Sequence, residues 1–532
     1  MKKIVSIFLA LFLASCGSYQ GAGNSTTGTS GAVSETGGQN VMAQSMPNDT
    51  YFSPNQWGLH NTGSYAYGYD DADIDAPEAW NITTGNQNLV IAVIDTGIDY
   101  NHADLVGNIW TNDDENCLDG IDNDLNGYID DCKGWNFVGD NNDPMDDYGH
   151  GTHVAGIIGA RGNNGEGVTG VMQRVKLMPL KIFDAYGMPA PDEEIAAAIK
   201  YAVDNGAKVI NASWGGPEFS PIIYDAIAYA NTHGVLFVAA AGNGMEDGIG
   251  GIDYVGDNND LFPHYPSSFE LPNIISVAAT DQRDQRVPFS NYGPNTVDVA
   301  APGVYIWSTV PNWWSEYDGY GRLETFEGTS MAAPHVTGLA GLMYSYHDGY
   351  QNTAFNYTQV RDTILRYVDW KESLNDWVAT HGRINAHKAV SAILTPTGLT
   401  ATAAHWIINT ADSPSINLSW ADNATGEDGY KIERRSDGGF AEIAVIGPDS
   451  TTYTDSGLDP VTEYTYRIRT YNNIADSFYS NEAGAVTLAG EEETHHGGGC
   501  SITAGKDAGR VDLLVMLLPV AAILTLIKRR KR

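Results

Sequence analysis

The chain has 532 residues, which is long enough for two or more folded domains. Its 66 acidic residues outnumber its 29 basic ones and give a formal net charge of −37 at pH 7, which argues against nucleic acid as a partner. The acidity fits a secreted, soluble surface that binds calcium, and plain solubilisation explains the same carboxylates equally well.

The N-terminal 45 residues carry targeting signals rather than a folded core. Residues 1–15 have the basic start, the apolar run and the small residues of a signal peptide. The segment Leu13-Ala14-Ser15-Cys16 resembles a bacterial lipobox, which implies cleavage before Cys16 and attachment of lipid to it. An ordinary signal peptide with a chance cysteine is the alternative. Residues 16–45 are rich in Gly, Ser and Thr, which predicts a flexible tether.

Residues 46–394 alternate apolar strands with amphipathic helices. Strands are expected at residues 89–94, 208–212, 235–240, 274–279 and 297–300, and helices at 149–160, 192–205, 221–233 and 329–345. This alternation predicts an α/β domain with a mostly parallel sheet flanked by helices on both faces. In such sheets the active groups lie at the ends of strands and the starts of helices.

Three short segments each place one reactive side chain among glycines and small residues. They are Ile94-Asp95-Thr96-Gly97, residues 149–156 around His150, and residues 328–336 around Ser330. A serine hydroxyl is a poor nucleophile until a histidine takes its proton, and the histidine needs a carboxylate to fix its tautomer and support its charge. The order Asp, His, Ser along the chain is that of the subtilisin type of triad.

Together with residues 213–216, 240–243 and 382–386, these motifs resemble the subtilase family, the subtilisin-like serine proteases, over residues 46–394. The resemblance implies a serine endopeptidase in which Ser330 is the nucleophile and His150 is the general base and then the general acid. Asp95 orients His150, and the Asn243 amide donates a hydrogen bond to the oxyanion. His153 is interpreted as a packing residue rather than a second base.

The resemblance also assigns Ser213, Trp214 and Gly215 to the pairing of the substrate backbone as an added strand. Side-chain selectivity then comes from a pocket, and residues 236–242 are expected to form one of its walls. An acidic insertion at residues 244–260 follows. One hypothesis is that its carboxylates favour Arg or Lys at the cleaved position, and the general acidity of the chain is the alternative explanation.

The spacing of residues 122–130 is that of a calcium loop, with Asp122, Asp124, Asn126 and Asp130 as candidate ligands. Because a lysine stands where a bidentate Glu is expected and no helix pair flanks the loop, a loop-type site is predicted rather than an EF-hand. A solvated acidic loop is the alternative here and for the two sites below.

Two further calcium sites are predicted. The first is Asp140 and Asp143, with Asp146 and Asp147 just ahead of His150, in a region where related subtilases such as thermitase hold calcium. The second follows the strong site of the family and comprises Asp49, Asp104 and Asn164. All these ligands are oxygen donors, which suit a structural Ca²⁺.

One close pair of cysteines, Cys117 and Cys132, brackets the first loop. In an exported protein such a pair predicts a disulfide, and two free thiols are the alternative. On the entropic model, closing a loop of about 15 residues contributes ~3 kcal/mol to stability.

Residues 395–489 change to short alternating stretches with turns between them, which predicts an all-β sandwich. Trp420, Leu458 and Tyr464 stand in segments that resemble a fibronectin type III domain. We interpret this domain as a spacer or as a module that binds substrate or matrix.

The C-terminus has a polar linker at residues 490–510, which contains Gly497-Gly498-Gly499-Cys500, and a hydrophobic segment with a basic end at residues 511–532. As a helix the apolar part reaches roughly 26 Å, enough for a thin membrane span with its basic end in the cytoplasm. The layout resembles sorting tails of the GlyGly-CTERM kind, which implies cleavage near the glycines. A permanent tail anchor is the alternative.

The sequence therefore predicts a calcium-stabilised, monomeric serine endopeptidase that is attached to the bacterial cell envelope or released from it. A non-enzymatic surface adhesion or scaffold protein with a relict protease fold is the competing function. The intact set of Asp95, His150, Ser330 and Asn243 argues against that competitor.

Overall fold

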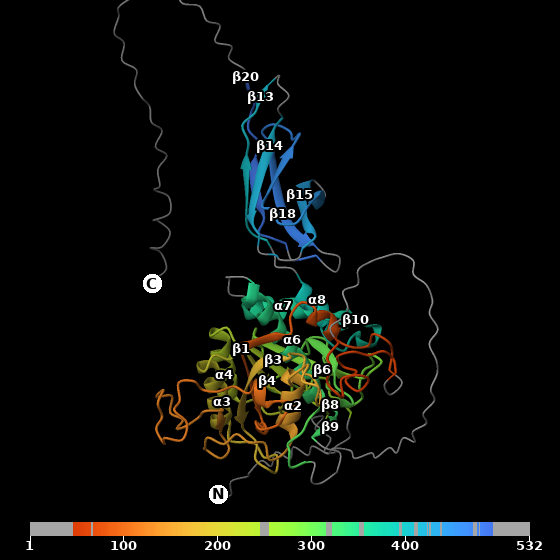
Figure 1. Ribbon diagram of the computed structural model, residues 1–532. Coiled ribbons are helices and arrows are strands. Elements are labelled where there is room, and N and C mark those ends of the chain that lie inside the picture. Colours follow the sequence, from red (N-terminus) through yellow and green to blue (C-terminus); the bar gives the residue numbers. More distant parts are fainter. Residues whose placement is uncertain are drawn as a thin grey trace, which may run out of the picture.

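The computed structural model describes residues 46–492, except for residues 65–67, 245–254, 315–321, 351–355, 393–395, 409–412, 423, 425–426, 437–438, 472–475 and 478 (Figure 1). The first part of the chain is an α/β unit whose last helix ends at Ser391, and an all-β unit begins at Thr397. The predicted signal peptide, the tether and the hydrophobic C-terminal segment lie outside the described residues. Among the described helices, none has the length and apolar character needed to cross a membrane.

One large sheet organises the α/β unit, and within the described residues it has nine strands. Their spatial order is β10 (Asp369–Trp370), β11 (Gly382–Arg383), β7 (Val299–Pro302), β6 (Ile274–Thr280), β5 (Leu236–Ala240), β4 (Val209–Ala212), β1 (Gly85–Asp95), β3 (Arg174–Lys181) and β2 (Trp135–Asn136). All neighbouring pairs are parallel except β10 and β11. The predicted α/β fold with a mostly parallel sheet is confirmed.

Helices cover both faces of this sheet. They are α1 (Ala76–Trp80), α2 (His150–Gly159), α3 (Asp192–Asp204), α4 (Pro221–Thr232), α6 (Thr329–Tyr350), α7 (Tyr357–Arg366) and α8 (Ala386–Ser391). Strand β1 is buried on both sides: Ile91 and Val93 join the core beneath α2 and α6, and Ala92 and Ile94 join the core beneath α3 and α4. Successive side chains of a strand point to opposite faces, so an apolar run is needed to fill both cores.

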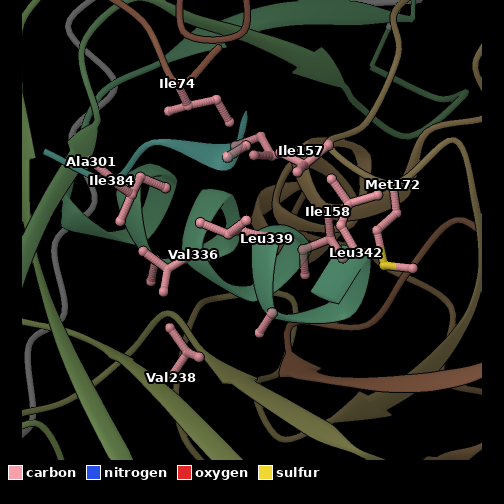
Figure 2. Close-up of a cluster of buried hydrophobic side chains, with 14 of the residues drawn as sticks. Ile74, Ile157, Ile158, Met172, Val238, Ala301, Val336, Leu339, Leu342 and Ile384 are labelled. Atoms are coloured by element: carbon pink, nitrogen blue, oxygen red, sulfur yellow. The ribbon is translucent and has the colours of Figure 1, made fainter. Parts of the chain in front are cut away.

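Helix α6 lies at the centre of the first core. All its residues from 329 to 345 are buried. Figure 2 shows Leu339 of α6 beside Ile157 and Ile158 of α2, and Val336 of the same helix near Val238 of β5. A helix enclosed in this way has little freedom to shift, so the position of its first turn is set by the core.

Smaller elements complete the α/β unit. They are the hairpin of β8 (Ile306–Thr309) and β9 (Leu323–Phe326) and the 3₁₀ turns η1 (Val106–Asn108) and η2 (Glu372–Leu374). Their short, mixed sequences carry no periodic signal. Strand β1 also starts earlier than predicted, because the backbone of the polar residues 85–88 extends a strand whose apolar signal begins at Leu89.

The C-terminal unit is the predicted all-β sandwich. One sheet contains β12 (Thr397–Ala403), β14 (Ser415–Ala421) and β17 (Thr452–Ser456), and the other contains β16 (Gly439–Ile446), β15 (Gly429–Ser436), β18 (Glu463–Tyr471) and β19 (Ala483–Val486). A short parallel pair, β13 (Ile407–Ile408) and β20 (Glu491–Glu492), lies beside them. Trp420 and Leu418 from one sheet pack with Tyr430, Ile432 and Tyr466 from the other.

Candidate active site

The predicted catalytic segments converge on one edge of the large sheet. Strand β1 ends at Asp95, β4 is followed by Ser213, and β5 is followed by the segment that ends at Asn243. These three strands are parallel neighbours, so their carboxyl ends lie side by side. Helices α2 and α6 begin at His150 and Thr329.

A short buried hydrogen bond joins Asp95 and His150. The His150 Nδ1 atom lies 2.7 Å from Asp95 Oδ1, and the two residues are 5% and 1% exposed. Burial alone would lower the pKa of the imidazole, but the adjacent Asp95 carboxylate more than offsets it, so the pKa of His150 lies above its ordinary value. With Nδ1–H donated to the carboxylate, Nε2 is the nitrogen that can accept a proton.

A second carboxylate, Asp146, fastens the two elements that carry this pair. It is fully buried and accepts hydrogen bonds from Thr96 Oγ1 at 2.9 Å, Gly149 N at 2.8 Å and Thr152 Oγ1 at 2.6 Å. Thr96 follows β1, and Gly149 and Thr152 belong to the start of α2. Asp146 therefore caps the helix of His150 and ties it to the strand that ends at Asp95.

The Ser330 side chain is 3% exposed and lies in the first turn of α6. Its hydroxyl donates to the Ser213 carbonyl oxygen at 3.0 Å, and Ser213 Oγ donates to the Ser330 carbonyl oxygen at 2.8 Å. Asn211 Nδ2 donates to Ser213 Oγ at 2.9 Å, and Thr337 Oγ1 donates to Asn211 Oδ1 at 2.8 Å. This buried chain of polar groups holds the start of α6 against the end of β4.

The Asn243 amide is oriented by Thr329, the residue before Ser330. Asn243 Oδ1 accepts hydrogen bonds from Thr329 N at 2.9 Å and from Thr329 Oγ1 at 3.0 Å. With the oxygen held this way, Nδ2 is the side of the amide that can donate to another group. The first N–H groups of α6, including that of Ser330, lack an acceptor within the helix and carry the positive end of its dipole.

The predicted substrate segment lies beside these groups. Trp214 Nε1 donates to the Ile94 carbonyl oxygen at 2.9 Å, and Gly215 is exposed. The next residue, Gly216, pairs with Tyr265 through two backbone hydrogen bonds of 2.8 and 2.7 Å. The segment is thus held on one side. The sequence motifs do not identify Asn211, which contacts Ser213 from inside the protein, because isolated polar residues in apolar strands are common and carry no pattern.

In the first calcium loop the structure brings together Glu115, Asp124 and Asp131, whose carboxylate oxygens lie within 4.8 Å of one another. Of the predicted ligands, only Asp124 belongs to this group. Asp122 and Asp130 accept backbone N–H groups of the loop instead. The spacing pattern starts at residue 122, so it misses Glu115.

Two other groups hold the same loop together. The disulfide between Cys117 and Cys132 is present, as predicted. Asn126 Nδ2 donates to Asp131 Oδ2 at 2.8 Å, so in this state Asn126 links two carboxylates rather than offering its own oxygen, which accepts Tyr128 N. Glu115 is buried, and its Oε2 atom has no hydrogen-bond partner among the described residues.

The other two predicted calcium sites differ in the burial of their carboxylates. Asp49 and Asp104 are both buried, and Asn164 contacts each of them: its Nδ2 donates to Asp104 at 2.7 Å and its N–H to Asp49 at 3.3 Å. Burial, with a smaller contribution from the neighbouring Asp49, raises the pKa of Asp104 to about 6. Asp140 and Asp143 are exposed, and neither joins a group of three possible ligands within the described residues.

Comparison with protein families decides the identity of the first unit. Residues 86–393, more than half of the chain, match the Subtilase family model, peptidase S8. This chain belongs to the subtilase family. Residues 405–485 match the Fibronectin type III domain, in agreement with the sandwich of the second unit.

Three relatives illustrate the similarity of this subtilase to known proteases. The "Thermophilic serine proteinase" of Bacillus sp. (strain AK1) is 37% identical over 65% of this chain and 69% of the relative. "Thermitase" of Thermoactinomyces vulgaris is 35% identical over 65% of this chain and 99% of the relative. The "Cell wall-associated protease" of Bacillus subtilis (strain 168) is 36% identical, over 66% of this chain but only 36% of the relative. The subtilase described here is therefore a subtilisin-like serine endopeptidase, and its substrates are proteins.

His153 is a packing residue of this subtilase. Its ring stacks on Phe326 with a centroid distance of 4.2 Å, and Nε2 lies 3.2 Å from the Glu324 carbonyl oxygen. Burial lowers the pKa of His153 to about 3, so the ring is neutral at physiological pH. This agrees with its interpretation as a packing residue.

We expect Asp146→Asn to lower kcat by about tenfold and to move the acidic limb of the pH profile of kcat/KM to lower pH. An amide N–H facing backbone donors leaves buried groups unsatisfied at a cost of about 1–3 kcal/mol, which loosens the start of α2. Losing the charge also removes an interaction that raises the pKa of His150. Rates measured from pH 4 to 10 test this.

The control for that experiment is Asp225→Asn, which changes an exposed carboxylate on α4. If Asp146→Asn lowers the melting temperature but leaves the acidic limb where it is in the parent enzyme, Asp146 has no electrostatic effect on His150.

Proposed function

We propose that this subtilase cleaves proteins at the bacterial cell envelope, with Asp95, His150 and Ser330 as its catalytic triad and Asn243 as the oxyanion donor. The observation that carries the proposal is the buried 2.7 Å contact between Asp95 and His150, at the sheet edge where the first turn of α6 presents Ser330. Such a pair activates a nearby hydroxyl, which is the chemistry that peptide-bond cleavage requires.

In the proposed mechanism, Ser330 Oγ attacks the carbonyl carbon of the scissile bond while its proton passes to His150 Nε2. The imidazolium is stabilised by the Asp95 carboxylate, and the new oxyanion accepts hydrogen bonds from Asn243 Nδ2 and the Ser330 N–H. His150 then gives its proton to the leaving amine, and the C–N bond breaks. Water, deprotonated by the same imidazole, hydrolyses the acyl-enzyme and restores the Ser330 hydroxyl.

Substrate binding is assigned to the segment Ser213 to Gly215. Its far side is already occupied, since Gly216 pairs with Tyr265, and Gly215 is exposed. An extended substrate can therefore add to its open side through backbone hydrogen bonds, which accommodate many sequences. The Ser213 side chain serves a different purpose, because it is directed at the Ser330 carbonyl oxygen.

The envelope location rests on the two ends of the chain. A lipid on Cys16 anchors the chain to a membrane, and the hydrophobic segment at residues 511–532 directs the protein to the envelope as a sorting tail or, when it is not cleaved, serves as a second anchor. The relative named "Cell wall-associated protease" supports an envelope location as well. The tether at residues 16–45 would let the catalytic unit reach substrates away from the membrane surface.

Calcium is proposed as a structural cofactor at two places. The first is the group Glu115, Asp124 and Asp131, where a buried carboxylate oxygen has no partner within the described residues and a cation would supply one. The second is Asp49 with Asp104, where burial raises the pKa of both carboxyl groups and the neighbouring Asp49 adds to the rise at Asp104. A divalent cation reverses that rise, because it favours the charged form of both groups.

The decisive test of the proposed function is labelling with a fluorophosphonate, which reacts covalently with an activated serine. We expect the folded, calcium-loaded protein to be labelled, Ser330→Ala to lose all label, and Ser345→Ala to keep it. Ser345 is a buried serine on the same helix, so it controls for packing. Absence of label on the parent protein would favour the adhesion or scaffold function.

Replacing Asn243 by Ala should lower kcat by about 100- to 1000-fold with little change in KM, because the lost hydrogen bond forms only with the developing oxyanion. Steady-state kinetics on one peptide substrate measure this. The control is Asn205→Ala, which alters an amide beyond the end of α3. Equal losses in kcat for the two variants, or a rise in KM alone, would exclude the oxyanion role.

Calcium removal should lower the melting temperature strongly at pH 8 and weakly at pH 5. When the calcium concentration is 100 times the Kd of a site, binding adds about 2.7 kcal/mol to the free energy of unfolding. As the pH falls, protons compete with calcium for the same carboxylates. Without calcium, the pH dependence of stability from Asp104 has the opposite direction. The pKa of Asp104 in the folded protein is about 6, above its ordinary 3.8. Its contribution to stability is therefore present below pH 4 and is lost as the pH rises through 6.

Two variants show how much of the fall in melting temperature on calcium removal comes from each site. Asp104→Asn should abolish the part of the chelation effect that comes from the second site, and Glu115→Gln the part from the first. A melting temperature that chelator leaves unchanged at pH 8 would remove calcium from both sites.

A further inference from the structure

A buried histidine, His264, lies between the two segments that border the proposed substrate-binding region. A Cβ atom placed on Gly215 would lie 2.2 Å from His264 Cε1, and one placed on Gly242 would lie 2.9 Å from His264 Cδ2. The ring therefore packs against both glycines, and any larger residue at either position would overlap it. Neither the triad nor the oxyanion donor involves this side chain.

The geometry of the site determines which part of a substrate would meet this ring. The substrate backbone pairs with the segment that ends at Gly215, and the attacked carbonyl oxygen lies at Asn243, directly after Gly242. The residue that supplies that carbonyl must bridge the two segments. Its side chain then points into the space between them, where the imidazole of His264 already lies.

The histidine is held firmly in place. Its backbone carbonyl accepts Ser267 Oγ at 2.8 Å, its N–H donates to Ser268 Oγ at 3.2 Å, and its Nδ1 lies 3.3 Å from Ser267 Oγ. The next residue, Tyr265, is bonded to Gly216 through both backbone groups. Its backbone is tied on both sides and only 5% of the residue is exposed, so the ring is enclosed where it lies.

The ring is also uncharged under working conditions. Burial lowers the pKa of His264 to about 4, so the imidazole is neutral at pH 7 and offers no charge to a substrate side chain. Of the acidic insertion at residues 244–260, the described Asp260 binds Asn295 and Thr296 through its carboxylate. Within the described residues, Asp260 thus has partners of its own and adds no support for a preference for Arg or Lys.

We propose that His264 forms the floor of the pocket for the residue whose carbonyl is attacked, and that it makes this pocket short, so that the enzyme cleaves after small uncharged residues such as Ala and Ser rather than after Phe or Leu. The inference rests on the proposed catalytic function, because it uses the positions of Asn243 and the substrate segment. Filling a pocket by even one methylene changes discrimination by about 10- to 200-fold, so a whole imidazole ring is a large determinant.

Two substitutions test the proposal on a pair of peptides that differ only by Ala or Phe before the cleaved bond. His264→Gly lengthens the pocket, and we expect the ratio of kcat/KM for Phe over Ala to rise at least tenfold. His264→Phe keeps the space filled with a somewhat larger ring, so it should not raise that ratio above that of the parent. Rates are normalised to the sites titrated by fluorophosphonate, so partial misfolding does not alter the ratio.

The parent enzyme provides a test that needs no variant. Mass spectrometry of cleavage products from a denatured protein mixture should show Ala, Ser and Gly enriched before the cut, and Phe and Leu depleted. A parent that cleaves preferentially after Phe, or a His264→Gly variant with an unchanged ratio, overturns the inference. A parent that carries no fluorophosphonate label defeats the proposed function itself, so the two failures are distinct.

Discussion

Helix α6 is enclosed by other elements along residues 329–345, and a helix that is apolar on all sides is stable only when it is surrounded in this way. The large sheet covers one side of α6, and α2 packs against another. Because the helix is locked in the core, its first turn emerges at one defined place on the sheet edge. That place is where β1, β4 and β5 end, and it determines where Ser330 can lie.

Polar contacts then set the fine geometry of the site. Asp146 joins the end of β1 to the start of α2, and Asn211 joins β4 to α6. Both groups are buried, and buried polar networks of this kind rigidify a site because each lost partner leaves an unsatisfied group in a medium of low dielectric. The Asp95 and His150 pair gains from the same surroundings, since its charge-assisted hydrogen bond is weakly screened.

The acidic loop between Cys117 and Cys132 shows what a spacing pattern can and cannot predict about a metal site. The pattern at residues 122–130 predicts a calcium loop, of whose ligands only Asp124 joins the group of converging carboxylates, and the predicted disulfide between Cys117 and Cys132 closes the loop. The pattern did not show which oxygens converge, because Glu115 enters from the segment before the disulfide and the folded loop turns Asp122 and Asp130 toward backbone N–H groups. Ligand sets depend on such turns, which are decided by the whole loop.

The sequence by itself determined the fold class and the two folded units, and it predicted Asp95, His150 and Ser330 as the reactive residues, because apolar periodicity and motif order are properties of the chain alone. Tertiary structure decided which side chains support them. Asn211 and His264 stand in no motif, and Asp146 was predicted only as part of a calcium site. Their importance comes from contacts with segments distant in the sequence: Thr96 with Asp146, Thr337 with Asn211, and Gly215 and Gly242 with His264. A local sequence pattern cannot predict these contacts, because folding brings together residues that have no fixed separation in the sequence.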